Sequence, residues 1–393
     1  IRGAKRGTAP GPSGLRPDFL RQVVGDKGPG KPGCGVLLSL ANLLASGQAP
    51  GFLRPFVGGA RGTAFRKQSK QGEPDARPVC SGEALRRVVG RALLATELDT
   101  LRDHLLPYQL AVGVSAGAEV MPHLARQWRE HYRTDRSRVL LTYDESNAHN
   151  LVDRHTFLVR MREVCPGLSR WLEFIYPTSQ AGKVFYRGRV LASAAGGQQG
   201  CPLMMACHAV VQRLMLESLG LMPPLPGSEI VVPILEPPAR LDMAPCFADD
   251  GFLAGPAPEV LRALRHLRAV MPPLGLRFSE LAVGAAAGSQ HAVDWAPFVA
   301  EGCRVDVEGS FEVLKSPVGS RSFCQAFSSA LADKQASVAA AIADLPDAQV
   351  AHYLLHWTCS ASRMQYLART TPRLDCAAGL SRFDDAIREA FGR

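Results

Sequence analysis

Apolar and polar positions follow two different periods along the chain, which predicts a mixture of α-helices and β-strands. Short apolar runs next to charge or turn residues predict a strand at 139–144, two strands at 183–191 around Gly188, and a hairpin at 245–254. Gly/Pro-rich stretches predict loops at 28–35 and 58–75. Apolar residues at helical spacing predict helices at 83–106, 119–132, 151–164, 202–219, 258–270, 323–343 and 347–367. The pattern therefore favours an α+β fold.

The chain has 393 residues, more than the roughly 100 to 200 of a usual domain, so several lobes are expected. Changes in pattern separate three zones: 1–138, 139–310 and the mostly helical 311–393. No apolar run approaches the length of about 18 residues that a membrane span needs. We therefore expect no membrane segment. The missing initial Met predicts that the sequence is part of a longer protein.

Positive charge is concentrated in the first zone. The net charge is +9, and residues 1–138 contain 22 Lys and Arg against 11 Asp and Glu, whereas the remainder contains 23 against 25. Such an excess suits a polyanion such as nucleic acid, because Lys and Arg neutralise phosphates. The alternative is a solvated, arginine-rich surface. Ten scattered cysteines without a Cys-x-x-Cys pair indicate reduced, mostly buried thiols and an intracellular protein, nuclear or cytoplasmic.

Three acids are candidates for metal chemistry. Asp144 ends the apolar run at 139–144, and Asp249 and Asp250 lie between the apolar flanks of the predicted hairpin. Carboxylates that converge from neighbouring strands suit Mg²⁺, which prefers oxygen ligands. Taken alone, Asp144 is equally compatible with a helix cap, and an Asp-Asp-Gly turn is more often a solvated hairpin tip.

The order of the segments around these acids resembles reverse transcriptases of the non-LTR retroelement type, over residues 11–372. The second and third palm blocks together are specific, whereas the opening and primer-grip blocks are weak alone. The matching blocks are the opening block 11–17, the fingers block with Lys67 and Arg77-Pro78-Val79, the palm motifs at 143–150, 196–203, 247–250 and 275–278, and the primer grip 313–319.

The resemblance implies a right-hand polymerase with fingers and fingers–palm helices in 1–138, a palm with an antiparallel sheet in 139–310, and a primer grip and helical thumb in 311–393. It implies RNA-templated DNA synthesis by two-metal nucleotidyl transfer, with two Mg²⁺ ions, or Mn²⁺ in their place, and with an RNA template, a DNA primer and deoxynucleoside triphosphates as partners. The implied residues are Asp144, Asp249 and Asp250 for metal and catalysis, Lys67, Arg77, His149, Gln199 and Gly200 for the nucleotide, and Gln198, Pro202, Lys315 and Gly319 for template and primer.

Four positions depart from the family's pattern. His149 stands where the family has the Phe or Tyr that excludes a ribose 2′-hydroxyl. Cys201 replaces an Asp, Lys315 replaces a Gly, and Ala282 stands where a Lys protonates the leaving pyrophosphate. Loss of a general acid costs about 10²- to 10⁴-fold in rate, so the resemblance is compatible with impaired activity.

Three functions follow as alternatives. The first is reverse transcription, and the second is a catalytically weak or inactive retroelement-derived protein that binds nucleic acid. The third is an RNA-dependent RNA polymerase, which shares the palm carboxylates but not the Gln-Gly-x-Pro block. For Arg77 the alternative to triphosphate binding is a surface ion pair with Glu73 or Asp75. The oligomeric state is not readable from the sequence.

Overall fold

The computed structural model describes residues 7–24, 32–68, 74–178, 182–286 and 292–392. The chain divides into two compact units. The first comprises Ile1–Val114, Glu145–Ala239 and Ala263–Ser279, and the second comprises Ser115–Asp144, Arg240–Arg262 and Glu280–Arg393. Helices and strands occur in both, so the fold is α+β, as the sequence predicts.

The first unit has, among its described residues, a four-stranded sheet in the order β2-β1-β4-β5. Its strands are β1 (Ala60–Gln68), β2 (Pro74–Gly82), β4 (Gly182–Tyr186) and β5 (Arg189–Ser193). Its helices are α1 (Pro17–Val24), α2 (Pro32–Ala45), the short 3-10 helix η1 (Gly51–Leu53), α3 (Arg54–Val57), α4 (Ala84–Leu105), α6 (Ala148–Leu151), α7 (Arg154–Val164), α8 (Pro166–Ile175), α9 (Met204–Ser218) and η2 (Pro272–Leu274).

Helix α9 is the centre of the first unit's core. Nearly all of its side chains are buried, and these include the polar residues His208, Gln212, Arg213 and Glu217 as well as apolar ones. It packs against α4 and α7, and α7 packs in turn against α8. The start of α7 is fixed by Asp153, whose carboxylate accepts a 2.7 Å hydrogen bond from the Thr156 N–H. The start of α8 is fixed by Pro166, which lacks the N–H that would have no partner there.

A charged cluster lies inside this core. The guanidinium of Arg160 donates to Glu217 at 2.6 Å, and Arg213 Nε donates to the same carboxylate oxygen at 2.9 Å. Arg160 is 0% exposed and Glu217 is 2% exposed, so neither charge is solvated by bulk water. Glu217 therefore bridges two buried positive charges, and Glu163 adds a longer contact of 3.5 Å to Arg160.

The second unit has, in its described part, a five-stranded sheet in the order β6-β7-β3-β8-β9, with α10 (Ala257–Val270) running out of it. β3 and β7 are antiparallel, and β8 and β9 are parallel. Adjacent residues of β3 are buried, which shows that both faces of this strand are covered. The remaining elements of the sheet and its surroundings are α5 (Gly117–His131), β3 (Arg138–Glu145), β6 (Cys246–Phe247), β7 (Asp250–Pro256), β8 (Phe278–Ala285), α11 (Ala296–Ala300) and β9 (Arg304–Asp306).

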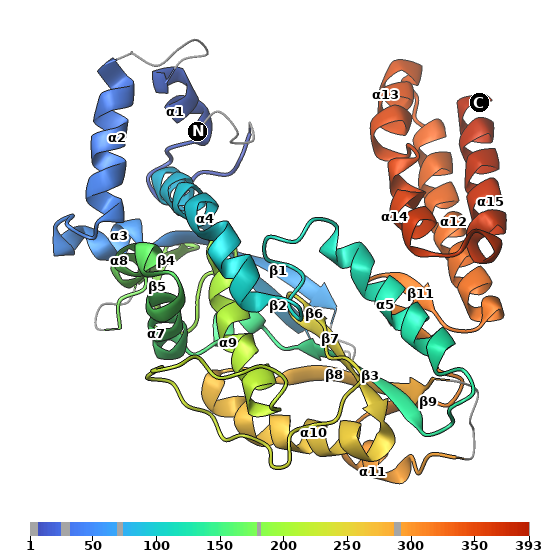
Figure 1. Ribbon diagram of the computed structural model, residues 1–393. Helices are drawn as coiled ribbons and strands as arrows, with labels where there is room; N and C mark the ends of the chain where they lie inside the picture. The colour runs from blue at the N-terminus through green and yellow to red at the C-terminus, as the bar shows by residue number, and fades with distance from the viewer. Residues whose placement is uncertain (1–6, 25–31, 69–73, 179–181, 287–291, 393) are drawn as a thin grey trace. The chain divides into compact units, whose positions relative to one another are not determined.

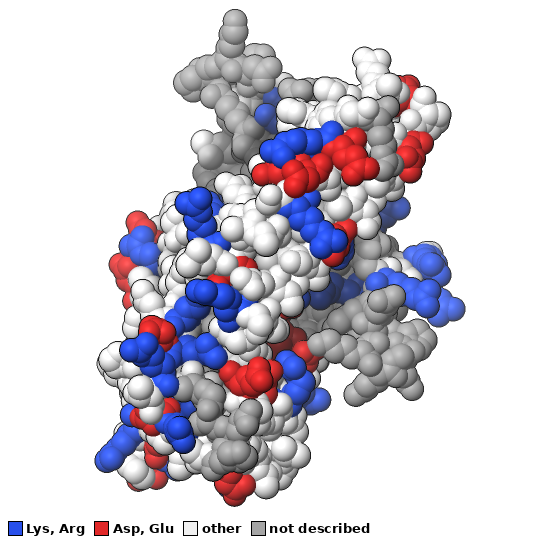
Figure 2. Space-filling view, turned by 90° about the vertical axis from the view of Figure 1, so that its right-hand side faces the viewer, with Lys and Arg blue, Asp and Glu red and all other residues white. Residues whose placement is uncertain are grey.

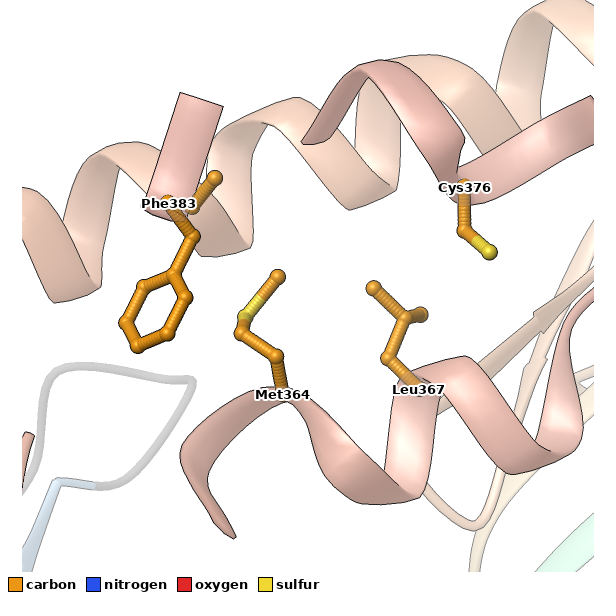
Figure 3. Packing of buried hydrophobic residues seen from close by; sticks show 5 residues of the cluster. Met364, Leu367, Cys376 and Phe383 are labelled. Carbon is orange, nitrogen blue, oxygen red and sulfur yellow. The ribbon is translucent and has the colours of Figure 1, made fainter. Parts of the chain in front are cut away.

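A short hairpin and a group of helices complete the second unit. Helices α12 and α15 run along one another, and Gly379 is required at their contact because a Cβ there would lie 2.1 Å from Ser328 Oγ. Met364, Leu367, Cys376 and Phe383 converge in the buried core of this group (Figure 3). The elements are β10 (Phe311–Val313), β11 (Ser316–Val318), α12 (Arg321–Ala343), α13 (Ala348–Thr358), α14 (Ser362–Thr370) and α15 (Arg373–Gly392).

The structure corrects several sequence-based boundaries. The expected loop at 58–75 is mostly the β1–β2 hairpin, and the end of the expected loop at 28–35 belongs to α2, while 25–31 and 69–73 lie outside the described residues. The expected helix at 151–164 is divided into α6 and α7, and that at 347–367 into α13 and α14. Pro202 precedes α9, whose N-cap is Leu203, rather than lying in its first turn.

The prediction of unpaired, mostly buried thiols is confirmed. All ten cysteines are free, seven of them buried. No described helix is long and apolar enough to cross a membrane. Figure 2 shows basic and acidic side chains interspersed on one face of the molecule, rather than a continuous basic stripe.

Candidate active site

Two of the three predicted metal ligands face each other across neighbouring strands. Asp144 lies near the end of β3 and Asp250 begins β7, and the two are direct partners in the antiparallel register (Figure 1). Side chains at such positions lie on the same face, with Cβ atoms about 5 Å apart. Asp249 immediately precedes Asp250, in a two-residue turn with Ala248, whose φ is +58°. The sheet thus brings all three acids to one strand end.

These positions exclude the helix-cap alternative for Asp144 and locate the two acids of the Asp-Asp-Gly turn. Asp144 is part of a strand, and the next helix, α6, has Asn147 as its N-cap, so Asp144 is not a helix cap. Asp249 occupies the hairpin turn, as the Asp-Asp-Gly pattern predicts, but Asp250 belongs to the strand. All three carboxyl residues are half-buried rather than fully solvated.

The electrostatics of the cluster favour a cation. The pKa of Asp250 is raised to about 7, first because its carboxyl group is partly buried and then because Asp144 and Asp249 repel its charge. Glu280 adds to this repulsion, and the Lys315 ammonium opposes it. Oxygen donors of this kind fit Mg²⁺. Within the described residues, however, no group of three or more His, Cys, Asp or Glu side chains is already gathered closely enough to hold a metal ion.

We expect Asp250→Asn to stabilise the metal-free protein at alkaline pH. A pKa raised above the unfolded value means that the folded state binds a proton more tightly, so the contribution of Asp250 to wild-type stability is greatest below about pH 4 and is lost as pH rises through 7. Asn carries no charge to repel. Above pH 7 the variant is expected to be more stable by about 1–2 kcal/mol, a value reduced for partial exposure, and the gain should vanish near pH 4.

Thermal melting over pH 4 to 9, with and without Mg²⁺, checks this prediction. Mg²⁺ should raise the melting temperature of the wild type more than that of Asp250→Asn, because the cation removes the repulsion in the intact cluster. Glu308→Gln, which removes an exposed acid of the same unit and leaves the cluster intact, serves as the matched control and should follow the wild type at every pH and Mg²⁺ concentration. An Asp250→Asn variant whose stability follows the wild type at every pH would contradict the assignment.

The predicted Gln-Gly loop is held from inside the first unit. Gln198 is 4% exposed, and its amide nitrogen donates to Gly58 O at 2.8 Å while its amide oxygen accepts from Arg86 at 2.5 Å. Its backbone N–H donates to the Tyr176 hydroxyl at 3.1 Å. The side chain of Gln198 therefore fixes the loop, and a contact of this residue with template stays a prediction.

The two following residues lie against strand β2. The carbonyl of Gln199 accepts the Cys80 N–H at 2.9 Å, which leaves its half-buried side chain outside this backbone contact. Gly200 has φ +114°, and a Cβ there would lie 2.4 Å from the Cys80 carbonyl oxygen. Only glycine fits this position without moving the strand. Pro202, half-buried, lies 3.1 Å from the place where a Cβ on Gly90 would be.

His149 lies in α6, beside a buried polar network of the first unit. Its ring is edge-on to that of His208, with centroids 6.0 Å apart. His208 Nε2 lies 2.9 Å from Glu145, whose other oxygen accepts from Gln212 at 2.7 Å. The His149 ring thus packs against His208, which is itself held by Glu145 and, through it, linked to Gln212. Its role toward a sugar stays a prediction.

The predicted fingers residues lie on the β1–β2 hairpin. Arg77 is exposed and is the register partner of Phe65, which is 56% exposed, so the two side chains project from the same face of the hairpin. Lys67 belongs to β1 opposite Asp75, but the side chains of both, like all of Glu73, lie outside the described part of the chain. Neither the triphosphate contact nor the alternative ion pair is therefore tested.

The predicted primer-grip residues lie on and next to the β10–β11 hairpin. Leu314 and Lys315 form its two-residue turn and both have positive φ, +47° and +66°. Lys315 stands in a conformation that favours glycine, the residue expected there from the resemblance. Its ammonium lies 2.6 Å from Glu312. The hydrogen bond to Glu312 is the largest effect that raises the pKa of Lys315, and the negative charges of Asp250 and Glu280 raise it further. Gly319 follows β11, where a Cβ would lie 2.5 Å from Ser310 Oγ.

Two arginines of α5 donate hydrogen bonds to the β10–β11 hairpin and to the residues next to it. Arg126 donates to Ser316 Oγ at 3.0 Å and also to the carbonyls of Pro317 and Thr370. Arg129 donates to the Gly319 carbonyl at 3.0 Å and to another loop carbonyl. The sequence gives no sign of this function, because an arginine pair one turn apart on a helix usually indicates a solvated face. Arg86 and Tyr176 were missed for another reason, because their partner Gln198 is 112 and 22 residues away along the chain.

Comparisons with known proteins add no relative. No protein-family model matches the chain, and no curated protein matches it significantly.

Proposed function

We propose that the chain carries out RNA-templated DNA synthesis by two-metal nucleotidyl transfer, as part of a retroelement-type reverse transcriptase with fingers, palm and thumb. The observation that carries the proposal is the register of β3 and β7, which sets Asp144 opposite Asp250 with Asp249 beside them. The raised pKa of Asp250, due to burial and then to its two acidic neighbours, supports a cation at this strand end.

In this reaction, each group of candidate residues would have its own role. Asp144, Asp249 and Asp250 would hold two Mg²⁺ ions, which supply activation of the primer hydroxyl and charge stabilisation at the phosphates. Arg77, with its planar fork of donors, would bind the triphosphate. Lys315, at the turn of the β10–β11 hairpin, would meet the primer. Ala282, on β8, cannot donate a proton to pyrophosphate, which predicts a slow enzyme.

A cavity in the first unit supports a nucleic-acid partner. It has a volume of about 690 Å³ and includes Phe56, Phe185 and Tyr186 together with Arg61, Arg187 and Arg189 in its lining. Aromatic faces and guanidinium groups together suit single-stranded nucleic acid, since bases stack on the rings and phosphates meet the cations. The positive charge of residues 1–138 agrees with this use.

Primer extension on an RNA template tests the proposal. Wild-type protein with Mg²⁺ and deoxynucleoside triphosphates is expected to extend a DNA primer, slowly, and to stop when the metal is chelated. Extension only with ribonucleotides would identify an RNA polymerase instead, a comparison that His149 makes necessary. Absence of extension with either substrate class, at any Mg²⁺ or Mn²⁺ concentration, would refute the polymerase proposal.

The second candidate is binding of nucleic acid without turnover. Two observations favour it: Ala282 replaces the expected proton donor, and no group of three metal-binding side chains is already assembled among the described residues. RNA binding that weakens steeply with salt, combined with no metal-dependent extension, would establish this function. Any metal-dependent incorporation abolished by Asp249→Asn would exclude it.

A further inference from the structure

The loop of residues 196–200 rests on a buried cation. Arg86 is 2% exposed, and its Nη1 donates to the Gly58 carbonyl at 2.8 Å and to Gln198 Oε1 at 2.5 Å. Its guanidinium carbon lies 5.1 Å from the centre of the Tyr176 ring, in a cation–π contact. Among the described residues, the oxygens that accept from it belong to neutral carbonyl and amide groups. The charge is therefore buried without an anionic acceptor.

Part of this guanidinium has no hydrogen-bond partner. Arg86 Nε and Nη2 are both buried and make no hydrogen bond within the described part of the chain. Buried donors without acceptors are rare and cost free energy. Two unpaired N–H groups on a fully buried cation mark a place where an anionic oxygen would be bound strongly.

A thiol lies beside this place. The Cys201 N–H donates to the Gln198 carbonyl at 3.0 Å, and the Tyr176 hydroxyl and the Cys201 thiol both lie close enough to the Arg86 guanidinium to raise its pKa. The pKa of Arg86 is raised overall: burial, the largest effect, lowers it, but Tyr176 and Cys201 raise it. Cys201 is half-buried, so a small oxidant can reach it.

The other cysteines offer no comparable surroundings. Seven are buried, and only Cys34 and Cys80 share the intermediate exposure of Cys201. Burial raises the pKa of the Cys80 thiol, and the opposing effect of Arg86 does not overcome it. The Cys34 thiol donates to the carbonyl of Val24 at 3.7 Å. Cys80 also lies near Arg86, but burial favours its neutral thiol, so Cys201 is the half-buried cysteine beside this cation that we expect to react.

We propose that Cys201 is an oxidation site, at which a peroxide converts the thiol to a sulfenate that Arg86 and Tyr176 bind. The sulfur attacks one oxygen of hydrogen peroxide, the S–O bond forms as the O–O bond breaks, and the departing hydroxide takes the thiol proton to leave as water. The resulting sulfenic acid then releases its hydroxyl proton to solvent water, which leaves the sulfenate anion beside the Arg86 guanidinium. Sulfur is oxidised by two electrons and the peroxide is reduced. The new oxygen accepts from the unpaired N–H groups of Arg86. This site does not depend on polymerase activity.

The test compares the rates at which the ten thiols are oxidised. Reduced protein is exposed to limiting hydrogen peroxide with dimedone, which traps sulfenic acid, and the adducts are located by peptide mass spectrometry. Cys201 is expected to be trapped at least about tenfold faster than Cys34 or Cys80, the effect of one hydrogen bond to a charged group. Equal rates, or faster trapping at either of the other two, would overturn the proposal.

Two further measurements separate the buried cluster from the bare thiol. In urea the preference for Cys201 should disappear, because Arg86 and Tyr176 no longer surround it. A preference that survives unfolding would refute the structural cause without any variant. Tyr176→Phe, which keeps the ring but removes the hydroxyl, should slow trapping at Cys201 and leave Cys34 unchanged.

Stability gives an independent readout. Peroxide is expected to raise the melting temperature of the wild type, because the sulfenate gives Arg86 the anionic partner that it lacks. Cys201→Ser should show no such rise. Cys201→Asp, which carries a permanent carboxylate at this place, should melt higher than the wild type without peroxide. A fall in the wild-type melting temperature on oxidation of Cys201 would contradict the proposal.

Discussion

Asp249→Asn is expected to lower the rate of primer extension by about 10³-fold, which corresponds to a loss of about 4 kcal/mol of transition-state stabilisation. The substitution keeps the size of the side chain in the β6–β7 turn but removes an anionic ligand from the strand end that Asp144 and Asp250 share. The loss should appear in kcat rather than in KM for the primer–template, because the metal acts at the reacting phosphate. Single-turnover incorporation measures it directly.

A matched control separates loss of the ligand from general loss of negative charge. Glu308→Gln removes an exposed acid of the same unit and should change the rate by less than about twofold, as a screened surface charge does. The melting temperature of Asp249→Asn should stay near that of the wild type, which excludes unfolding as the cause. A variant that retains a tenth of wild-type activity would show that Asp249 is not a ligand.

The strand end that carries these acids was predictable because its signals are local. An apolar run that ends at Asp144, and two acids between apolar flanks, are visible in any short window of sequence. The register that sets Asp144 opposite Asp250 is not local, since it pairs residues more than a hundred positions apart. Only the order of the surrounding motifs suggested it. The structure shows this pairing directly, whereas no short stretch of the sequence contains both strands.

The β1–β2 hairpin was predicted to be a loop because its sequence lacks the alternation of apolar and polar residues that is typical of a strand. Charged residues such as Arg61 and Arg66 fall on both faces of β1, and glycines near its start suggested a loop. The hairpin is mostly exposed, so burial imposes little apolar pattern on it.

The sequence also gives no sign that Arg86, a charged residue of α4, is buried. Its partner Gln198 is 112 residues away, beyond any helical period.

Glu217→Gln is expected to destabilise the protein by about 3–5 kcal/mol, the largest effect on stability that the structure predicts. The carboxylate accepts from Arg160 at 2.6 Å and from Arg213 at 2.9 Å, and without it two guanidinium groups stay charged in the core. The strength of their field is visible at His104, whose pKa is lowered to about 3 by burial and then by Arg213 and Arg160. Urea unfolding measures the loss.

Two comparisons show whether burial of charge is the cause. Glu173→Gln breaks the pair with Arg162, which has the same kind of geometry at 2.8 Å but is about half exposed, and should cost less than about 1 kcal/mol. Replacing Arg160→Met, Arg213→Met and Glu217→Leu together removes the two guanidinium groups and the carboxylate that bridges them, while Glu163 keeps its hydrogen bonds from Ser228 Oγ at 2.8 Å and from the Glu229 N–H at 2.7 Å. This triple variant should recover most of the stability lost by Glu217→Gln, because apolar side chains of similar volume need no compensating charge. If the triple variant is as unstable as the single one, the cluster stabilises the core by its shape and hydrogen bonds, and the electrostatic account of Glu217 is wrong.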